Sequence, residues 1–200
     1  MATSEDAPTQ PIAIAPRIVA VPTGYPVAWM PSPHCSSVPR KLTQFVVVHC
    51  TDGHEGPSKA EDVARMLADP LLKPRRSAHY VCDSDSIVQC VRNDWQAWHA
   101  GHTANRRGVG VEITGRANQT DEQWLDDVSL ATLARASRVV ADLCAAYQLP
   151  RAFVRAGELV AGVRGITTHA EVSKAWRETT HTDPGPYFPL DAFVRAVVGA

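Results

Sequence analysis

Short apolar runs alternate with longer amphipathic stretches along most of this 200-residue chain. The runs FVVVHC (45–50) and GVGVEI (108–113) contain several β-branched residues, which is typical of buried strands. GITTH (165–169) predicts another strand, and two alternating runs within 78–91 predict a hairpin that turns at Asp83–Ser86. The pattern therefore predicts several strands that share one sheet.

Three stretches carry apolar residues at helical spacing and predict helices at 58–69, about 121–148 and about 190–198. Capping-box pairs mark the start of the first two: Ser58 with Glu61, and Thr120 with Gln123. The order along the chain is strand, helix, hairpin, strand, long helix, strand, helix. This order predicts a single α/β domain with a central mixed β-sheet flanked by helices.

The N-terminal stretch differs from the rest, because eight of the 15 prolines lie in the first 39 residues. Proline removes a backbone donor and interrupts regular structure, so we expect residues 1–40 to form an extended arm. Its apolar residues favour partial docking, with short strands within AIAPRIVAVP (13–22) and YPVAW (25–29). The compact domain is expected to span residues 41–200.

Composition narrows the range of partners. The formal net charge is −1 and no basic run is present, so electrostatics predicts neither a nucleic acid nor an anionic membrane as a partner. No apolar run approaches the roughly 18 residues of a membrane-spanning helix. The N-terminus lacks the features of a secretory signal, so we expect synthesis in the cytoplasm without that export route. A monomer is the expected state.

The cysteines give no sign of a disulfide framework or a zinc finger. There are five of them, an odd number, and no CxxC pair occurs. We therefore expect free thiols, most of them buried.

Two histidines and one aspartate stand where the chain is held rigidly. His49 and His169 end predicted strands, and Asp183 lies in the proline- and glycine-rich segment HTDPGP (181–186). Two imidazoles and one carboxylate are a ligand set for catalytic zinc, with a fourth position open to water. Their spacing matches no short metal-binding motif, and histidines satisfied within the core are the alternative interpretation.

Glu112 is a second candidate, because it interrupts an apolar strand where a carboxylate is costly unless it is paired or used. It is either a general base or the partner of a nearby arginine: Arg106, Arg107 or Arg116. Cys50, beside His49, suggests a cysteine nucleophile. Adjacent strand residues point to opposite faces, however, which argues against that pair.

Six short motifs occur in an order that resembles a known family: VVVHCT, SAHYV, WHAG, GVGVEITG, TTHAEVS and HTDPGPYFP. Together they resemble the type 2 zinc-dependent N-acetylmuramoyl-L-alanine amidases. That group includes phage endolysins, bacterial recycling amidases and animal peptidoglycan recognition proteins. The resemblance covers about residues 42–195, and it implies the fold of peptidoglycan recognition proteins.

The resemblance also implies a role for each candidate residue. His49, His169 and Asp183 match the positions of the Zn²⁺ ligands, and Glu112 matches the acidic residue beside the zinc water. His181 falls where many members have a lysine that supports the developing oxyanion, and a histidine makes that charge depend on pH. The residues expected to line the substrate groove are Trp98, His99, Gly101 and Asn105.

The implied activity is hydrolysis of the amide between N-acetylmuramic acid and L-alanine, so peptidoglycan or a muropeptide is the expected partner. We expect a phage endolysin or lytic amidase, made in the cytoplasm and reaching the cell wall through holin-made lesions. A cytosolic muropeptide-recycling amidase is one alternative. A peptidoglycan-binding module without catalysis is another, although the complete set of ligand residue types argues against it.

Overall fold

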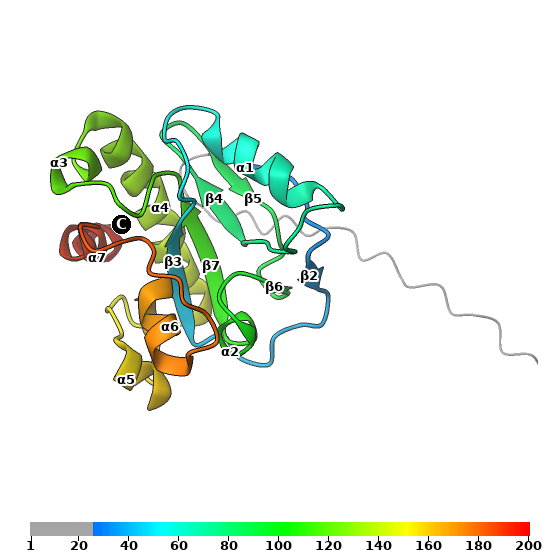
Figure 1. Ribbon diagram of the computed structural model, residues 1–200. Coiled ribbons are helices and arrows are strands. Elements are labelled where there is room, and N and C mark those ends of the chain that lie inside the picture. The colour runs from blue at the N-terminus through cyan, green and yellow to red at the C-terminus, as the bar shows by residue number, and fades with distance from the viewer. Residues whose placement is uncertain (1–25) are drawn as a thin grey trace, which may run out of the picture.

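The structure, a computed structural model, describes residues 26–200 and contains one six-stranded sheet with helices on both faces (Figure 1). Its strand order is β1-β5-β4-β7-β3-β8, and a separate two-stranded sheet pairs β2 with β6. Neighbouring strands of the large sheet are parallel, except for the antiparallel pair β4 and β5. This mixed sheet confirms the predicted α/β class.

The strands are β1 (Val27–Trp29), β2 (Cys35–Ser36), β3 (Phe45–Cys50), β4 (Tyr80–Cys82), β5 (Ile87–Gln89), β6 (Gln96–Ala97), β7 (Gly108–Ile113) and β8 (Gly165–Thr168). The helices are α1 (Lys59–Ala68), α2 (His102–Asn105), α3 (Asp121–Trp124), α4 (Asp127–Tyr147), α5 (Ala156–Val160), α6 (His169–Trp176) and α7 (Leu190–Gly199). The bounds of β3 and β7 and the hairpin of β4 and β5 are as predicted, and α7 confirms the last predicted helix.

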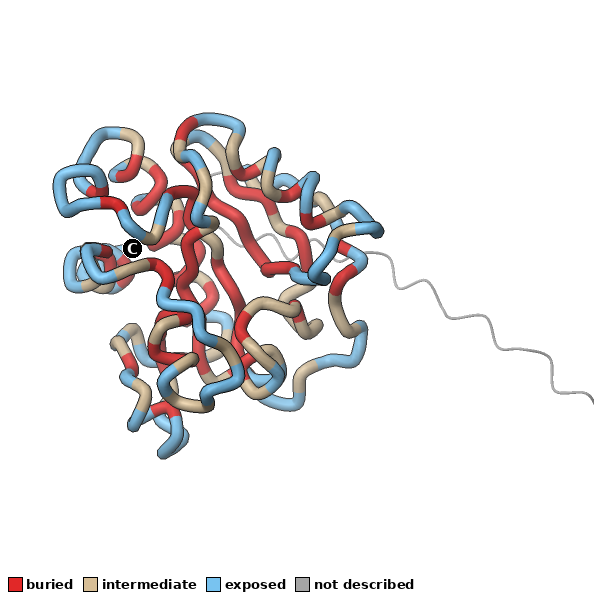
Figure 2. The backbone as a smooth tube through the Cα atoms, viewed as in Figure 1, coloured by how far each residue is buried: buried red, intermediate tan, exposed pale blue. Residues whose placement is uncertain are grey.

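The central strands are buried along nearly their whole length (Figure 2), and their successive side chains point to opposite faces of the sheet. Along β3, Val48 and Cys50 belong to the large apolar cluster that includes residues of α4 and α7. Phe45 and Val47 belong to a second cluster with residues of α5 and α6. Because successive side chains alternate, His49 points to the same face of the sheet as Phe45 and Val47.

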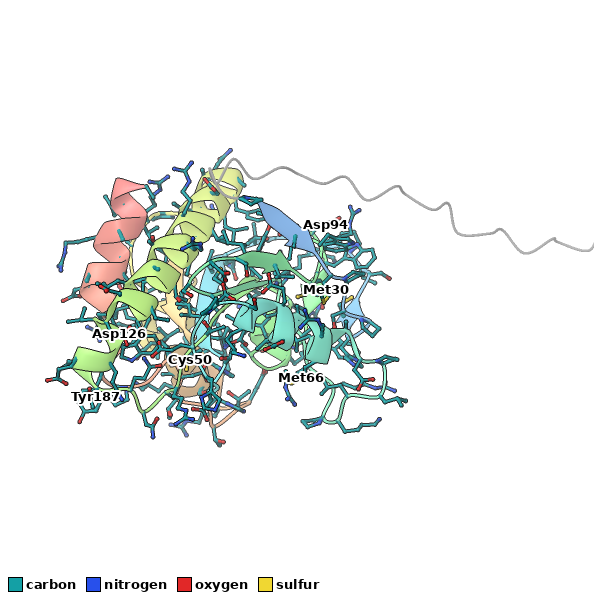
Figure 3. All side chains as sticks on the ribbon, turned by 90° about the horizontal axis from the view of Figure 1, so that it is seen from above. Met30, Cys50, Met66, Asp94, Asp126 and Tyr187 are labelled. Carbon is teal, nitrogen blue, oxygen red and sulfur yellow. The ribbon has the colours of Figure 1, made fainter. Side chains whose placement is uncertain are left out.

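The helices divide between the two faces in the same way. In Figures 1 and 3, α4 and α7 lie together on one side of the sheet, and α1 lies on the other. The parallel strands β3, β7 and β8 end together near α6. Ligands of open α/β sheets bind outside the carboxyl ends of parallel strands, so this edge is the place to expect a site.

The prediction of one helix at about 121–148 is wrong, because α3 and α4 are separate. The predicted capping box of Thr120 and Gln123 is confirmed at the start of α3. Asp126 then starts α4, and its carboxylate accepts a hydrogen bond from the backbone N–H of Ser129 at 2.8 Å. Such a cap favours a new helix because it satisfies an amide that has no partner within the helix.

The predicted capping box at Ser58 is also wrong. Ser58 has a φ of 62° and its side chain makes no capping hydrogen bond. Instead, Oδ2 of Asp83 accepts a hydrogen bond from the backbone N–H of Ala60 at 2.8 Å. The other carboxylate oxygen of Asp83 accepts from the N–H groups of Asp85 and Ser86, at 2.9 and 2.6 Å. One buried carboxylate therefore joins the hairpin turn to α1.

His169 does not end a strand as predicted, because β8 ends at Thr168 and His169 begins α6. The pattern analysis predicted neither α5 nor α6. The side chain of Thr168 accepts a hydrogen bond from the N–H of Glu171, and this Thr-x-x-Glu spacing is the signal that indicates α6.

Part of the expected arm contributes to both sheets. Strand β1, within the predicted segment 25–29, runs parallel to β5, and β2 pairs antiparallel with β6. The other predicted strand, within 13–22, lies outside the described residues.

Two expectations from composition can be compared with the structure. All five cysteines are free, and four of them are buried, as predicted. Within residues 26–200, no helix has the length and apolar character needed to cross a membrane.

Candidate metal centre

Three predicted ligand residues, distant in sequence, meet at the carboxyl ends of β3 and β8. His49 lies near the end of β3, and His169 directly follows β8, the strand that pairs with β3. Asp183 comes from the irregular segment before α7. All three are buried, with 2%, 4% and 8% of their surfaces exposed.

The ligand atoms of these residues form a small cluster, in which the two histidines face different oxygens of the Asp183 carboxylate. His49 Nδ1 lies 3.1 Å from His169 Nδ1 and 3.1 Å from Asp183 Oδ2, and His169 Nδ1 lies 3.0 Å from Asp183 Oδ1. A tetrahedral zinc ion with bonds of about 2.0–2.1 Å holds its ligand atoms roughly 3.3 Å apart. One ligand atom from each residue lies within 4.8 Å of the other two, and this spacing and the donor types fit a group that could hold a metal ion.

Both imidazoles turn the same nitrogen toward this point. Nε2 of His49 lies 2.9 Å from His99 Nδ1, and Nε2 of His169 lies 3.0 Å from Thr179 Oγ1. Thr179 Oγ1 is also 2.6 Å from Ser173 Oγ. When the outward nitrogen donates its proton to a neighbour, the lone pair on Nδ1 is free for a metal, which is the usual arrangement of a metal-binding histidine.

The segment around Asp183 is held by backbone contacts. The carbonyl of Asp183 accepts a hydrogen bond from the N–H of Ala170 in the first turn of α6, at 3.0 Å. Gly185 has a φ of 99°, and a Cβ there would overlap the carbonyl oxygen of Ala117, so glycine is required. In the metal-free protein, burial raises the pKa of Asp183, but hydrogen bonds from Nδ1 of the two histidines outweigh it and hold the pKa well below its usual value.

Glu112 lies on β7 in register with His49 on β3, so both side chains leave the sheet on the same face. Its Oε2 atom is buried and has no hydrogen-bond partner among the described residues. Burial, followed by the negative charge of Asp183, raises the pKa of Glu112 to about 8. Within residues 26–200 it forms no salt bridge with the arginines that were the alternative: Arg106, Arg107 and Arg116.

A cleft of about 820 Å³ opens over this centre and extends along α1. The three ligand residues and the candidate base line it, together with Trp98 and His99. Gly101 and Asn105 are not among the lining residues. Oδ1 of Asn105 accepts hydrogen bonds from two backbone N–H groups of the WHAG turn, at 2.9 and 2.8 Å, and so holds that turn. Substrate contact by these four residues stays a prediction.

His181 lies at the exposed edge of the centre. Its ring stacks on that of His169, with centroids 4.8 Å apart and 7° between the planes. Its Nδ1 is 3.8 Å from Asp183 Oδ1, and 69% of its side chain is exposed. A molecule in the cleft can therefore reach this imidazole, and its oxyanion role stays a prediction.

The sequence analysis missed two residues that support the centre, Glu178 and Thr179. The carboxylate of Glu178 accepts hydrogen bonds from the N–H and Oγ1 of Thr103, at 2.7 and 2.6 Å, which ties this segment to α2. Thr179, His181 and Asp183 occupy every second position, and the side chain of each contacts the ring of His169. This alternation is the signal that identifies Thr179.

The structure argues against Cys50 as a nucleophile. Cys50, labelled at the end of β3 in Figure 3, packs into the apolar cluster that faces α4. Burial raises the pKa of its thiol to about 12, so the reactive thiolate is scarce near neutral pH.

Comparisons with known proteins agree with this fold. The family described as N-acetylmuramoyl-L-alanine amidase (Amidase_2) matches residues 39–186. A comparison with curated proteins found no match.

Solved structures with the same fold include the hydrolase AmiA of Staphylococcus aureus in complex with its ligand. It has a TM-score of 0.66 and 19% identity over 86% of this chain and 83% of that chain. A mutant endolysin from Bacillus subtilis has a TM-score of 0.58 and 19% identity over 86% and 99%. A selenomethionine derivative of AmpD has a TM-score of 0.59 and 25% identity over 86% and 93%. Because the family match covers most of the sequence, this chain belongs to the N-acetylmuramoyl-L-alanine amidase family and is an enzyme of that family.

Proposed function

We propose that this amidase uses one Zn²⁺, held by His49, His169 and Asp183, to hydrolyse the amide between N-acetylmuramic acid and L-alanine in peptidoglycan. The observation that carries the proposal is the cluster of two imidazole nitrogens and the Asp183 carboxylate, with contacts of 3.0–3.1 Å, on the same face of the sheet as the Glu112 carboxyl. A zinc ion with such ligands acidifies a water molecule and polarises a carbonyl oxygen.

Glu112 accepts a proton from the attacking water. Burial raises the pKa of Glu112 to about 8, and a cation at the neighbouring ligands would favour its ionised form, the form that accepts a proton. As the C–N bond breaks, Glu112 gives this proton to the nitrogen of L-alanine, which leaves as a free amine. His181 donates a hydrogen bond to the oxygen that gains negative charge.

Within this proposal the protein is a phage endolysin or a related lytic amidase. The similar structures include an endolysin, and a proline-rich segment precedes the matched region. A recycling amidase is the alternative, and the two differ in substrate. An endolysin digests intact sacculi, whereas a recycling amidase acts on soluble muropeptides. Turnover on the two substrates therefore tests the role, and a clear preference for soluble muropeptides would favour recycling.

Metal analysis combined with digestion of purified peptidoglycan tests the chemistry. We expect about one zinc per chain and the release of new L-alanine amino termini. The release of reducing sugar ends alone would contradict the proposed bond. Binding to sacculi without any release would favour the non-catalytic module.

Two variants separate the roles of the site residues. Asp183→Ala should lose zinc, because it removes one of three ligands. Glu112→Ala should retain zinc and lose turnover by about 10²–10⁴-fold, the usual contribution of a general base. Glu122→Ala, which removes an exposed carboxylate on α3, is the matched control and should change neither.

A further inference from the structure

The outer nitrogen of His49 has an unusual partner. His49 Nε2 lies 2.9 Å from Nδ1 of His99, and the two rings meet edge to face with centroids 5.1 Å apart. Metal-binding histidines usually donate to carboxylates, backbone carbonyls or water. An imidazole accepts only through a nitrogen that carries no proton, so this contact constrains His99 as well as His49.

The proton positions along this contact follow from the chemistry of the ring. If His49 Nδ1 gives its lone pair to a metal ion, the proton of that ring is on Nε2, which donates to His99 Nδ1. His99 is then neutral, with its own proton on Nε2. That Nε2 atom is buried, and no described residue forms a hydrogen bond with it. With the ion bound, no hydrogen bond to Nε2 within residues 26–200 opposes this tautomer of His99. Without the ion, Nδ1 of His49 can instead donate to Oδ2 of Asp183 at 3.1 Å, and His99 Nδ1 then donates to His49 Nε2.

Two features hold the His99 ring against His49. Asn105 accepts hydrogen bonds from the backbone N–H groups of His99 and Ala100, which fixes the turn that carries the ring. Gly110, on the adjacent strand β7, leaves room for the ring, because a Cβ there would lie 2.7 Å from Cγ and Nδ1 of His99. Any side chain at position 110 would therefore push the ring away from its present place.

We propose that His99 is a positioning residue of the metal centre: it accepts the Nε2 proton of His49 and so keeps Nδ1 of His49 directed at the ion. This inference rests on the metal site proposed above. It differs from the substrate contact that the family resemblance implies for His99. A substrate contact alters the Michaelis constant, whereas a positioning residue alters metal affinity in the absence of substrate.

The tautomers in the zinc-loaded wild-type protein test the inference directly, without any substitution that could disturb folding. Long-range ¹H–¹⁵N correlation spectra of the histidine rings should show His99 protonated on Nε2 alone, and His49 protonated on its own Nε2. A proton on Nδ1 of His99, or on both of its nitrogens, would overturn the proposal.

Paired variants give the second test, with zinc dissociation constants measured by chelator competition. His99→Asn retains an acceptor close to the position of Nδ1, whereas His99→Leu has a similar size and none. We expect zinc binding to weaken by about 10–100-fold in the Leu variant and to stay within about threefold of wild type in the Asn variant. Gly110→Ala should also weaken zinc binding, because its Cβ displaces the His99 ring. His102→Leu, which removes an exposed imidazole at the start of α2, is the matched control.

The outcomes separate this inference from the proposed function. A wild-type protein that binds no zinc contradicts both. Zinc binding that is equally tight in the wild type and in His99→Leu contradicts only the positioning role. Melting curves without metal show whether each variant is folded. If a variant does not fold, the histidine tautomers of the wild-type protein test the positioning role instead.

Discussion

Glu112 carries an electrostatic cost in the metal-free protein, because its carboxyl is buried and Oε2 has no partner among the described residues. Its pKa is about 8 in the folded state, against an ordinary value of 4.5. Between these values the folded protein retains a proton that the unfolded chain has lost. The free energy of unfolding contributed by this group therefore falls as pH rises from about 4.5 to about 8.

Glu112→Gln should remove this fall, because an amide does not ionise. With a chelator present, we expect the variant to exceed wild type in unfolding free energy by on the order of 2–4 kcal/mol at about pH 9, and to match it at about pH 4. Urea unfolding at the two pH values measures the difference. If the unfolding free energies of the variant and the wild type differ equally at the two pH values, packing rather than ionisation distinguishes the two side chains.

Thr179 holds His169, the other imidazole of the proposed ligand set, since its Oγ1 lies 3.0 Å from Nε2 of His169. Thr179→Val preserves the shape of the side chain and removes the acceptor, so we expect the zinc dissociation constant to rise by about tenfold. Thr180→Val is the matched control, because that neighbouring side chain is exposed. Chelator competition measures both, and equal affinities would show that the hydroxyl does not orient His169.

At the scale of the elements, Asp83 joins the β4–β5 hairpin to α1 through one carboxylate. It accepts hydrogen bonds from the N–H groups of Ala60, Asp85 and Ser86, and it is fully buried. Asp83→Ala leaves these donors unpaired, so we expect the unfolding free energy to fall by about 2–4 kcal/mol.

The control for this prediction is Asp85→Ala, which removes an exposed carboxylate of the same turn that accepts from the N–H of Ser58 at 3.0 Å. We expect it to cost less than about 1 kcal/mol. Thermal or urea unfolding measures both variants, and similar losses would mean that the turn as a whole, rather than Asp83, fixes the start of α1.

The helices and strands differ in how well their own sequence predicts where they begin and end. The strand β3 is predictable because six consecutive buried residues encode it locally, and β7 is similar, with five buried residues and the partly buried Glu112. The start of α1 is different, because its capping carboxylate, Asp83, lies 23 residues away. The break before α4 has a local signal in Asp126, but a continuous apolar stripe across the break favours a single helix.

At the scale of the whole molecule, the residue types of the site are predictable and their contacts are not. His49 and Asp183 stand out because one ends an apolar run and the other lies in a rigid segment. The alignment of Glu112 with His49 depends on the parallel register of β7 and β3, which no local pattern encodes. The contact of His99 with His49 also requires the WHAG turn to fold back against β7.

The proposed metal centre joins three parts of the molecule: the end of β3, the start of α6 and the segment before α7. An ion that binds only the folded state stabilises it by about 2.7 kcal/mol when its free concentration is 100-fold above the dissociation constant. For a chain of this size, that corresponds to a rise in melting temperature of roughly 5–10 °C. We expect added zinc to produce this rise and a chelator to reverse it.

The same linkage predicts which segment zinc protects from hydrogen exchange, and it predicts that this protection requires Asp183. Zinc should slow amide hydrogen exchange most in residues 177–183, since this segment carries Asp183 and has few backbone hydrogen bonds of its own. Helix α4, whose buried side chains pack in the cluster on the opposite face, should change little at low denaturant. Asp183→Ala should show neither the local slowing nor the rise in melting temperature. If that variant responds to zinc as the wild type does, the ion binds elsewhere and the ligand set proposed here is wrong.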